Sequence, residues 1–155
     1  MGRLKYQGYS VVFQEVPGEI SLAFNISGCP YRCKGCHSPH LWDDIGRNLS
    51  KDFEAALNEY QNKITCVCFM GGDQGLNEIG RYCDIAHDRG LKTCIYTGAE
   101  SIPKDYVRCF DYIKVGPYIE ERGGLNKETT NQRMFRMIDG VAVEDITYRF
   151  KYRID

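Results

Sequence analysis

The sequence predicts one α/β domain, a small open partial (βα) barrel with mostly parallel strands and a short β-rich C-terminal tail. Short apolar runs rich in β-formers alternate with helical patterns, which is typical of βαβ units. Each unit takes roughly 30 residues, so a chain of 155 residues has room for about four or five steps and not for a closed eightfold barrel. We expect residues 1–155 to form a single domain, with a core over about residues 9–117 and a C-terminal extension over about residues 118–155.

Two strands are predicted at the start of the chain, over residues 9–16 and 19–27, with a turn at Pro17-Gly18 between them. The second strand alternates apolar with smaller or polar residues, and its apolar positions are Ile20, Leu22, Phe24 and Ile26. A cysteine-rich segment begins where this strand stops. In α/β folds, chemistry is usually carried at the carboxyl ends of strands.

Two amphipathic helices and two buried strands follow. Ser50 is predicted to cap the first helix, and Gly90 to follow the last turn of the second. Residues 64–70 and 91–97 are predicted to be buried parallel strands, and the first of them ends in Gly71-Gly72-Asp73. The apolar faces of the helices consist of Phe53, Ala56, Leu57 and Tyr60 in the first and of Leu76, Ile79, Cys83 and Ala86 in the second.

The remaining patterns are less regular. Ser101 is predicted to cap a helix over residues 102–109, and residues 111–115 to form a strand that ends at the Gly116-Pro117 turn. Residues 120–130 are polar and are expected to form a loop. At the end of the chain, aromatic and basic residues alternate, which predicts late strands rather than a helix: Tyr148, Phe150 and Tyr152 on one face, Arg149, Lys151 and Arg153 on the other.

Composition excludes several classes of protein. The formal net charge of −1 gives no basic bias to neutralise phosphates, so we expect no nucleic-acid partner. The chain has neither a signal-peptide core nor an apolar run long enough for a membrane span, so we expect no membrane association and a cytoplasmic location. Eight cysteines in a reducing compartment favour metal chemistry or buried thiols over a disulfide framework.

Three cysteines, Cys29, Cys33 and Cys36, have Cys-x3-Cys-x2-Cys spacing, which indicates one inorganic centre that uses all three thiolates. A zinc ion would take a fourth ligand, such as His37 or His40. A four-iron cluster would keep one iron without a protein ligand, where a substrate can bind. The spacing alone leaves both centres open.

The other five cysteines are expected to be buried thiols without a chemical role. Cys66 and Cys68 lie two residues apart on a predicted strand and face the same way, so a second metal site is the alternative for this pair. Cys83 falls on the apolar face of a helix, while Cys94 and Cys109 have apolar neighbours.

Two motifs together resemble the radical S-adenosylmethionine (SAM) superfamily. The cysteine loop after a strand resembles its cluster motif, and Gly71-Gly72-Asp73 resembles its SAM-contacting glycine-acid motif. Within the superfamily, roughly residues 10–138 are similar to the activating protein of anaerobic (class III) ribonucleotide reductase. The motifs that carry this similarity are Gly35-Cys36-His37, Pro39-His40-Leu41-Trp42, Tyr96-Thr97-Gly98 and Asn131-Gln132-Arg133.

The resemblance implies a radical SAM oxidoreductase with a 4Fe-4S cluster held by Cys29, Cys33 and Cys36 and with SAM on the open iron. It implies that SAM is cleaved reductively and that a glycyl radical forms on anaerobic ribonucleoside-triphosphate reductase, with an electron donor such as flavodoxin. No catalytic side chain is then needed beyond the cluster and bound SAM. The cofactor-binding residues that it implies are Gly35, Cys36, His37, Gly71, Gly72, Asp73 and Thr97.

The chain departs from the family patterns at two positions. Gly35 stands where many superfamily members have an aromatic residue, which favours the reductase-activator branch. Val115 stands where activators tend to have an acidic residue, so no role is transferred to it; its neighbour Lys114 is expected to be a solvated strand-end lysine rather than a contact to the SAM carboxylate. The alternative functions are a small-molecule enzyme similar to 7-deazaguanine synthase, the activase of another glycyl radical enzyme, and a zinc-stabilised interaction module without catalysis.

Overall fold

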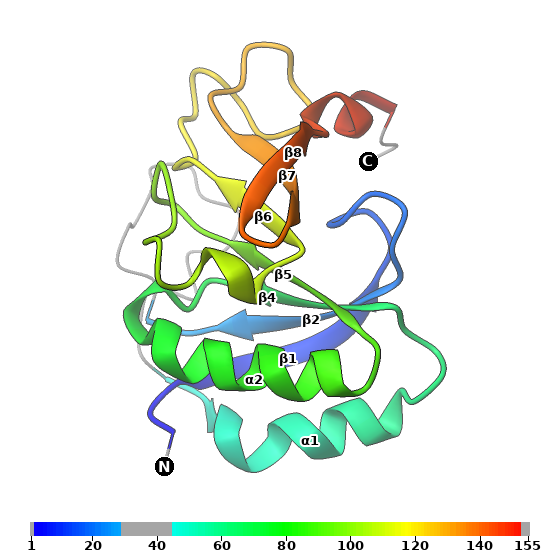
Figure 1. Cartoon of the computed structure of the whole chain (residues 1–155). Coiled ribbons are helices and arrows are strands. Elements are labelled where there is room, and N and C mark those ends of the chain that lie inside the picture. Colours follow the sequence, from blue (N-terminus) through cyan, green and yellow to red (C-terminus); the bar gives the residue numbers. More distant parts are fainter. Residues whose placement is uncertain (1, 29–44, 153–155) are drawn as a thin grey trace.

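The computed structural model describes residues 2–28 and 45–152 of the chain (Figure 1). Within these residues, eight strands form one mixed sheet in the order β3-β1-β2-β4-β5-β6-β7-β8. The helices are α1 (Leu49–Glu59) and α2 (Leu76–Asp88), and the 3-10 turns are η2 (Asp73–Gly75), η3 (Val107–Cys109) and η4 (Thr147–Tyr152). The strands are β1 (Lys5–Val12), β2 (Ser21–Ile26), β3 (Arg47–Asn48), β4 (Cys66–Met70), β5 (Lys92–Tyr96), β6 (Tyr112–Val115), β7 (Arg133–Ile138) and β8 (Val141–Asp145).

The centre of the sheet is parallel and its flanks are antiparallel. β2, β4, β5 and β6 run in one direction, and a row of buried residues crosses them in register: Phe24, Phe69, Ile95 and Ile113. β1 and β3 pair antiparallel on one flank, and β7 and β8 on the other. Three of the seven strand pairs are parallel and four are antiparallel, so the sheet is mixed rather than mostly parallel. Closure into a partial barrel stays a prediction. The carboxyl ends of the four central strands meet at one edge of the sheet.

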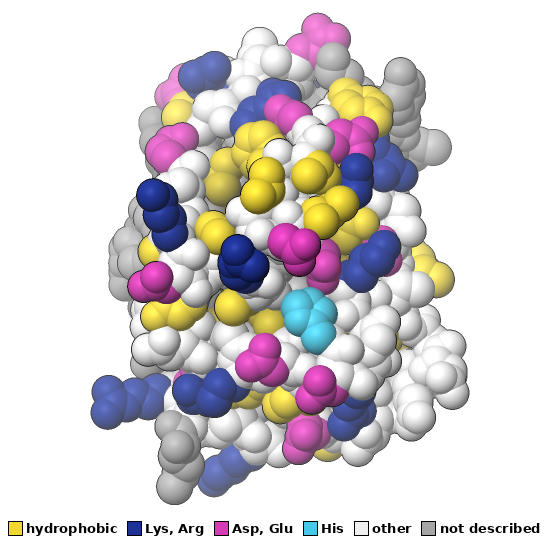
Figure 2. All heavy atoms as spheres, in the orientation of Figure 1, with side chains coloured by type: hydrophobic (Ala, Val, Ile, Leu, Met, Phe, Trp, Pro, Cys, Tyr) yellow, Lys and Arg dark blue, Asp and Glu magenta, His cyan; other side chains and the backbone are white. Residues whose placement is uncertain are grey.

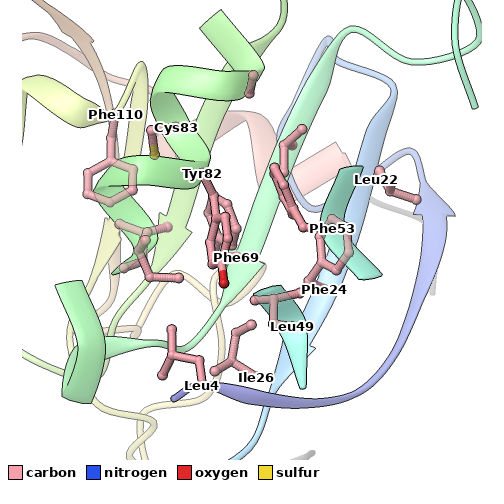
Figure 3. Packing of buried hydrophobic residues seen from close by; sticks show 14 of the residues in the cluster. Leu4, Leu22, Phe24, Ile26, Leu49, Phe53, Phe69, Tyr82, Cys83 and Phe110 are labelled. Atoms are coloured by element: carbon pink, nitrogen blue, oxygen red, sulfur yellow. The ribbon is translucent and has the colours of Figure 1, made fainter. Parts of the chain in front are cut away.

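One core lies between the sheet and the two helices. α1 and α2 contribute Phe53 and Tyr82, whose ring centroids are 4.6 Å apart. Phe53 packs with Phe24 and Phe69 of the sheet, and Tyr82 packs with Phe69 (Figure 3). The predicted apolar spacing of both helices is thus confirmed, because it aims one face of each helix at the same sheet. Cys83 belongs to this core as well, as expected.

A second core is formed by the residues of the same strands that alternate with those of the first core. Cys66, Cys68 and Cys94 are fully buried there, so the expectation of buried thiols is confirmed for these three cysteines. Cys66 and Cys68 belong to the same core, as expected for residues that face the same way. Phe150 and Leu125, from the C-terminal part of the chain, cover them. Cys109 is only half-buried and packs against the edge of the first core.

The start of the chain differs from its prediction in two places. The first strand is β1, four residues earlier than predicted, because Val16 leaves the sheet and packs into the second core. The predicted cap of α1 is also wrong. Asn48, in an extended conformation at the end of β3, is the N-cap, and its side chain accepts a hydrogen bond of 2.9 Å from the Ser50 amide.

The C-terminal part of the chain differs from its prediction more than the start does. The helix predicted over residues 102–109 is reduced to the single turn η3. The predicted late strands at residues 148–153 are also wrong where the chain is described, because Thr147–Tyr152 forms η4. Thr147 and Phe150, three residues apart, are both buried while Tyr148 is exposed, so the burial follows the period of a 3-10 turn and not that of a strand. The late strands are instead β7 and β8, just upstream.

The surface mixes both signs of charge. Acidic and basic side chains are interspersed on the face seen in Figure 2, and hydrophobic side chains gather over the β7–β8 hairpin. The exposed hydrophobic residues of that hairpin are Ile138, Val141 and Val143. None of the helices in the described part of the chain has the length and apolar character of a membrane span.

Candidate functional site

The candidate site lies at the carboxyl ends of the parallel strands, which we call the carboxyl edge. Ser27 and Gly28 follow β2, the segment 71–73 follows β4, Thr97 follows β5, and Gly116 follows β6. Parallel pairing brings these positions together although they are up to 89 residues apart in the chain (116 − 27). The structure thereby unites the predicted site residues Gly71, Gly72, Asp73 and Thr97.

Gly71 and Gly72 give the chain its sharp change of direction after β4. Both have φ values in the left-handed region, 105° and 107°, which favours glycine. A Cβ atom on Gly72 would also lie only 3.0 Å from the side chain of Ile79 in α2. The amide of Gly71 donates to the carbonyl of Tyr96 at 3.1 Å, so the turn is fixed to the end of β5.

Asp73 comes directly out of this turn and meets Thr97. The Thr97 hydroxyl, which is buried, donates a hydrogen bond to Oδ1 of Asp73 and accepts one of 3.0 Å from the Ala99 amide. A carboxylate has acceptor sites on both oxygens, so Asp73 can accept further N–H groups from a ligand. Asp73 and Thr97, which the sequence predicted separately, therefore form one hydrogen-bonded pair, in which the carboxylate of Asp73 is the group that can accept from a ligand.

The pKa of Asp73 is raised above its ordinary value. Burial is the largest cause, because it disfavours the charged form. The hydrogen bond from Thr97, a backbone hydrogen bond and the positive charge of Lys114 act in the opposite direction and favour the carboxylate.

Lys114 is buried, so the expectation of a solvated strand-end lysine is wrong. Only 8% of its surface is exposed. Its Nζ donates to the carbonyl of Gly116 at 2.9 Å and to that of Thr97 at 3.3 Å, and it lies 5.7 Å from the ring centroid of Tyr96. Lys114 lies on β6, an inner strand of the sheet between β5 and β7.

The motif Asn131-Gln132-Arg133 divides between two locations. Gln132 is buried and donates to the Gly116 carbonyl at 3.4 Å, while Asn131 donates to the Pro117 carbonyl at 3.1 Å. Arg133 instead bonds Asp145 of the hairpin. The first two residues of the motif therefore support the carboxyl edge, and the third supports β8.

Ser27 is the residue of this edge that sequence reasoning missed. Its hydroxyl donates to the carbonyl of Ile45, and its own carbonyl accepts a hydrogen bond of 2.6 Å from Gln74. Ser27 and Ile45, which flank the cysteine segment in the sequence, are thus linked to each other. Gln74, directly after the turn at residues 71–73, is joined to Ser27. The available signal was a small polar residue directly after an apolar strand and before Gly28-Cys29.

The predicted site residues Cys29, Cys33, Gly35, Cys36 and His37 lie outside the described residues. Gly28, which precedes Cys29 in the sequence, lies at the carboxyl end of β2 with φ of 78°. Gly28, the last described residue before the motif, therefore lies at the same edge as the Asp73–Thr97 pair.

The described cysteines do not offer a second metal centre. Across residues 2–28 and 45–152, no three His, Cys, Asp or Glu side chains come together in a way that could hold a metal ion. Burial raises the pKa of the Cys66, Cys83 and Cys94 thiols, which favours the protonated form over the thiolate that binds metals. Ligation by Cys29, Cys33 and Cys36 stays a prediction, because these three residues lie outside the described part of the chain.

Comparison with known families gives one match. Residues 17–99, more than half of the chain, match the family described as a 4Fe-4S single cluster domain. The matched segment contains the three motif cysteines, the turn at residues 71–73 and Thr97. No curated protein and no solved structure matches the chain.

Proposed function

Because the chain belongs to the 4Fe-4S single cluster domain family, we propose that it is a radical SAM activase. It would cleave SAM reductively and generate a glycyl radical on anaerobic ribonucleoside-triphosphate reductase. The observation that carries this proposal is the carboxyl edge, where Ser27 and Gln74 join the end of β2, just before the cysteine motif in the sequence, to the turn that presents Asp73.

The proposed cluster ligands are Cys29, Cys33 and Cys36, which lie inside the matched segment. When bound by three thiolates, a 4Fe-4S cluster supplies a one-electron reductant and one iron without a protein ligand. The chain has no fourth cysteine near these three in sequence. Cys66 and Cys94 are buried in the second core, which makes them unsuitable as the missing ligand.

The proposed SAM-binding residues act through their backbone and one carboxylate. Without side chains, Gly71 and Gly72 allow the backbone to approach the methionine part of SAM. Asp73, held by Thr97, accepts hydrogen bonds from the SAM ammonium group, and a charged pair makes such bonds stronger than neutral ones. Gly35, Cys36 and His37 are proposed to lie near the adenine, in keeping with the family resemblance.

The proposed substrate bond is the Cα–H bond of a glycine in the reductase. No acid or base of this chain is needed for that step, so its residues contribute binding and orientation. The proposed electron donor is a small reducing protein such as flavodoxin, and the proposed location is the cytoplasm.

The test is electron paramagnetic resonance of anaerobically reconstituted protein with a reductant, SAM and the reductase. We expect the signal of a reduced 4Fe-4S cluster that changes when SAM is added, followed by a glycyl radical signal on the reductase. SAM cleavage that a small heterocycle stimulates, without any glycyl radical, would assign a small-molecule reaction instead. Colourless protein that contains zinc and no acid-labile sulfide would refute the enzyme altogether.

A further inference from the structure

Lys114 carries a positive charge into the interior of the protein, close to the proposed SAM site. Burying an ammonium group is costly unless hydrogen bonds and an opposite charge compensate it. Two hydrogen bonds come from the carbonyls of Thr97 and Gly116, at the ends of β5 and β6. The Lys114 side chain therefore connects the ends of two adjacent strands at the carboxyl edge.

The contacts of Lys114 continue to Asp73 through Thr97. The carbonyl of Thr97 accepts from Lys114, while the hydroxyl of the same residue donates to Asp73. The charge of Lys114 also acts on Asp73 directly and favours its carboxylate. Lys114 is thus coupled to Asp73 by one intervening residue and by electrostatics.

We propose that Lys114 is a positioning residue for the Asp73–Thr97 pair: its buried ammonium orients Thr97 and supplies the positive charge that keeps the neighbouring carboxylate ready for an ammonium ligand. The role of Asp73 as a SAM ligand rests on the proposed function, whereas the coupling between Lys114 and Asp73 does not. Lys114 touches no substrate in this role and acts through Thr97 and Asp73.

The charged surroundings of Asp73 are simple in the described part of the chain. The neighbouring ends of β2 and β5 present Ser27 and Thr97, which are uncharged. Lys114 of β6 is the group whose charge acts on Asp73. Removal of the Lys114 charge should therefore raise the pKa of Asp73 further, because this charge lowers the pKa that burial raises.

Gln132 provides a matched control. It is buried at the same place and donates to the same Gly116 carbonyl as Lys114, at 3.4 Å, but it is neutral. Gln132→Leu removes a donor without removing a charge, and Lys114→Met removes both. A difference between the two variants in the titration of Asp73 or in SAM affinity therefore measures the effect of the Lys114 charge.

The experiment follows two quantities in the reconstituted full-length protein as a function of pH: the affinity for SAM and the infrared band of the protonated Asp73 carboxyl, assigned with Asp73→Asn. For Lys114→Met we expect both titrations to move to higher pH, with SAM affinity about tenfold lower at neutral pH, a loss comparable to that of one charge-assisted contact. For Gln132→Leu, which removes a donor to the same carbonyl but no charge, we expect a clearly smaller displacement of both titrations.

Unchanged titrations in Lys114→Met would overturn the proposal, and so would an equal displacement in Gln132→Leu. If Lys114→Met does not fold, Lys114→Gln, which keeps a donor without the charge, takes its place. Failure of both variants to fold would also overturn it, since Lys114 would then be a requirement of the sheet and not of the Asp73–Thr97 pair. If wild-type protein binds no SAM while the carboxyl band still moves in the variant, the proposed function fails and the coupling stands.

Discussion

The side-chain amide of Gln74 donates a hydrogen bond of 2.6 Å to the main-chain carbonyl of Ser27. This bond joins η2 to the end of β2, and thereby the turn that presents Asp73 to the residue two positions before Cys29. The Ser27 hydroxyl in turn binds the carbonyl of Ile45, on the other side of the cysteine segment. Two hydrogen bonds thus join three segments: η2, the end of β2 and Ile45.

Gln74→Leu removes the donor of this bond. We expect a loss of about 1 kcal/mol in the free energy of unfolding, as for one net hydrogen bond, and a several-fold weaker affinity for SAM. Urea unfolding and equilibrium SAM binding measure the two effects. Gln61→Leu, an equally exposed change in the turn after α1, is the control and should alter neither quantity.

Cys33→Ser should abolish cluster assembly, because a hydroxyl is a poor substitute for a thiolate on iron. Iron and acid-labile sulfide, measured after anaerobic reconstitution, should both be lost along with SAM cleavage. Cys66→Ser makes the same chemical change in the second core, where burial raises the pKa of the thiol, and should retain both the cluster and SAM cleavage. Equal loss of iron in both variants would mean that the cluster ligands are wrongly assigned.

Asp73→Asn should lower SAM affinity by about tenfold to a hundredfold, because it replaces a charged acceptor of the ammonium group with a neutral one. The amide oxygen can still accept from Thr97, so the local hydrogen bond survives and the cluster content should not change. Asp105→Asn, at an exposed position, serves as control. SAM affinity equal to that of wild type would remove Asp73 from the site.

The same substitution should stabilise the fold at neutral pH. Burial raises the pKa of Asp73, so the folded state holds this proton more tightly than the unfolded chain. The contribution of Asp73 to stability is therefore largest at low pH and declines as the pH rises from the ordinary aspartate range through the raised pKa. Urea unfolding across pH should show this decline in wild-type protein and a smaller one in Asp73→Asn. If the free energy of unfolding had the same pH dependence in both proteins, Asp73 would not have a raised pKa in the folded state.

Phe53→Ala should cost about 3–5 kcal/mol of unfolding free energy, the usual range for truncation of a fully buried phenylalanine. Phe53 is 1% exposed and packs with rings from the sheet and from α2 (Figure 3). Phe13→Ala makes the same chemical change at a side chain that is 67% exposed, and should change stability by less than about 0.5 kcal/mol. Urea unfolding followed by circular dichroism compares the two.

Local patterns predicted the elements whose period was unambiguous. Phe53, Ala56 and Leu57 recur at helical spacing, and α1 follows them; the short apolar run before Gly71 became β4. The patterns failed where burial depended on distant residues. Phe150 is buried because it packs against residues of β2, β4, β5 and β6, which lie more than 30 residues earlier in the chain. The alternation of aromatic and basic residues around Phe150 therefore did not indicate a strand.

The amino-acid sequence by itself determined which residue types the candidate site contains: three cysteines at Cys-x3-Cys-x2-Cys spacing, two glycines before an aspartate, and a threonine after the next strand. Residue type and spacing are local properties, so they can be read directly. Only the tertiary structure decided how Asp73 meets Thr97 and why Lys114 is buried. Those relationships depend on parallel pairing of strands from separate parts of the chain, which sets the dielectric surroundings and the charge that Asp73 experiences.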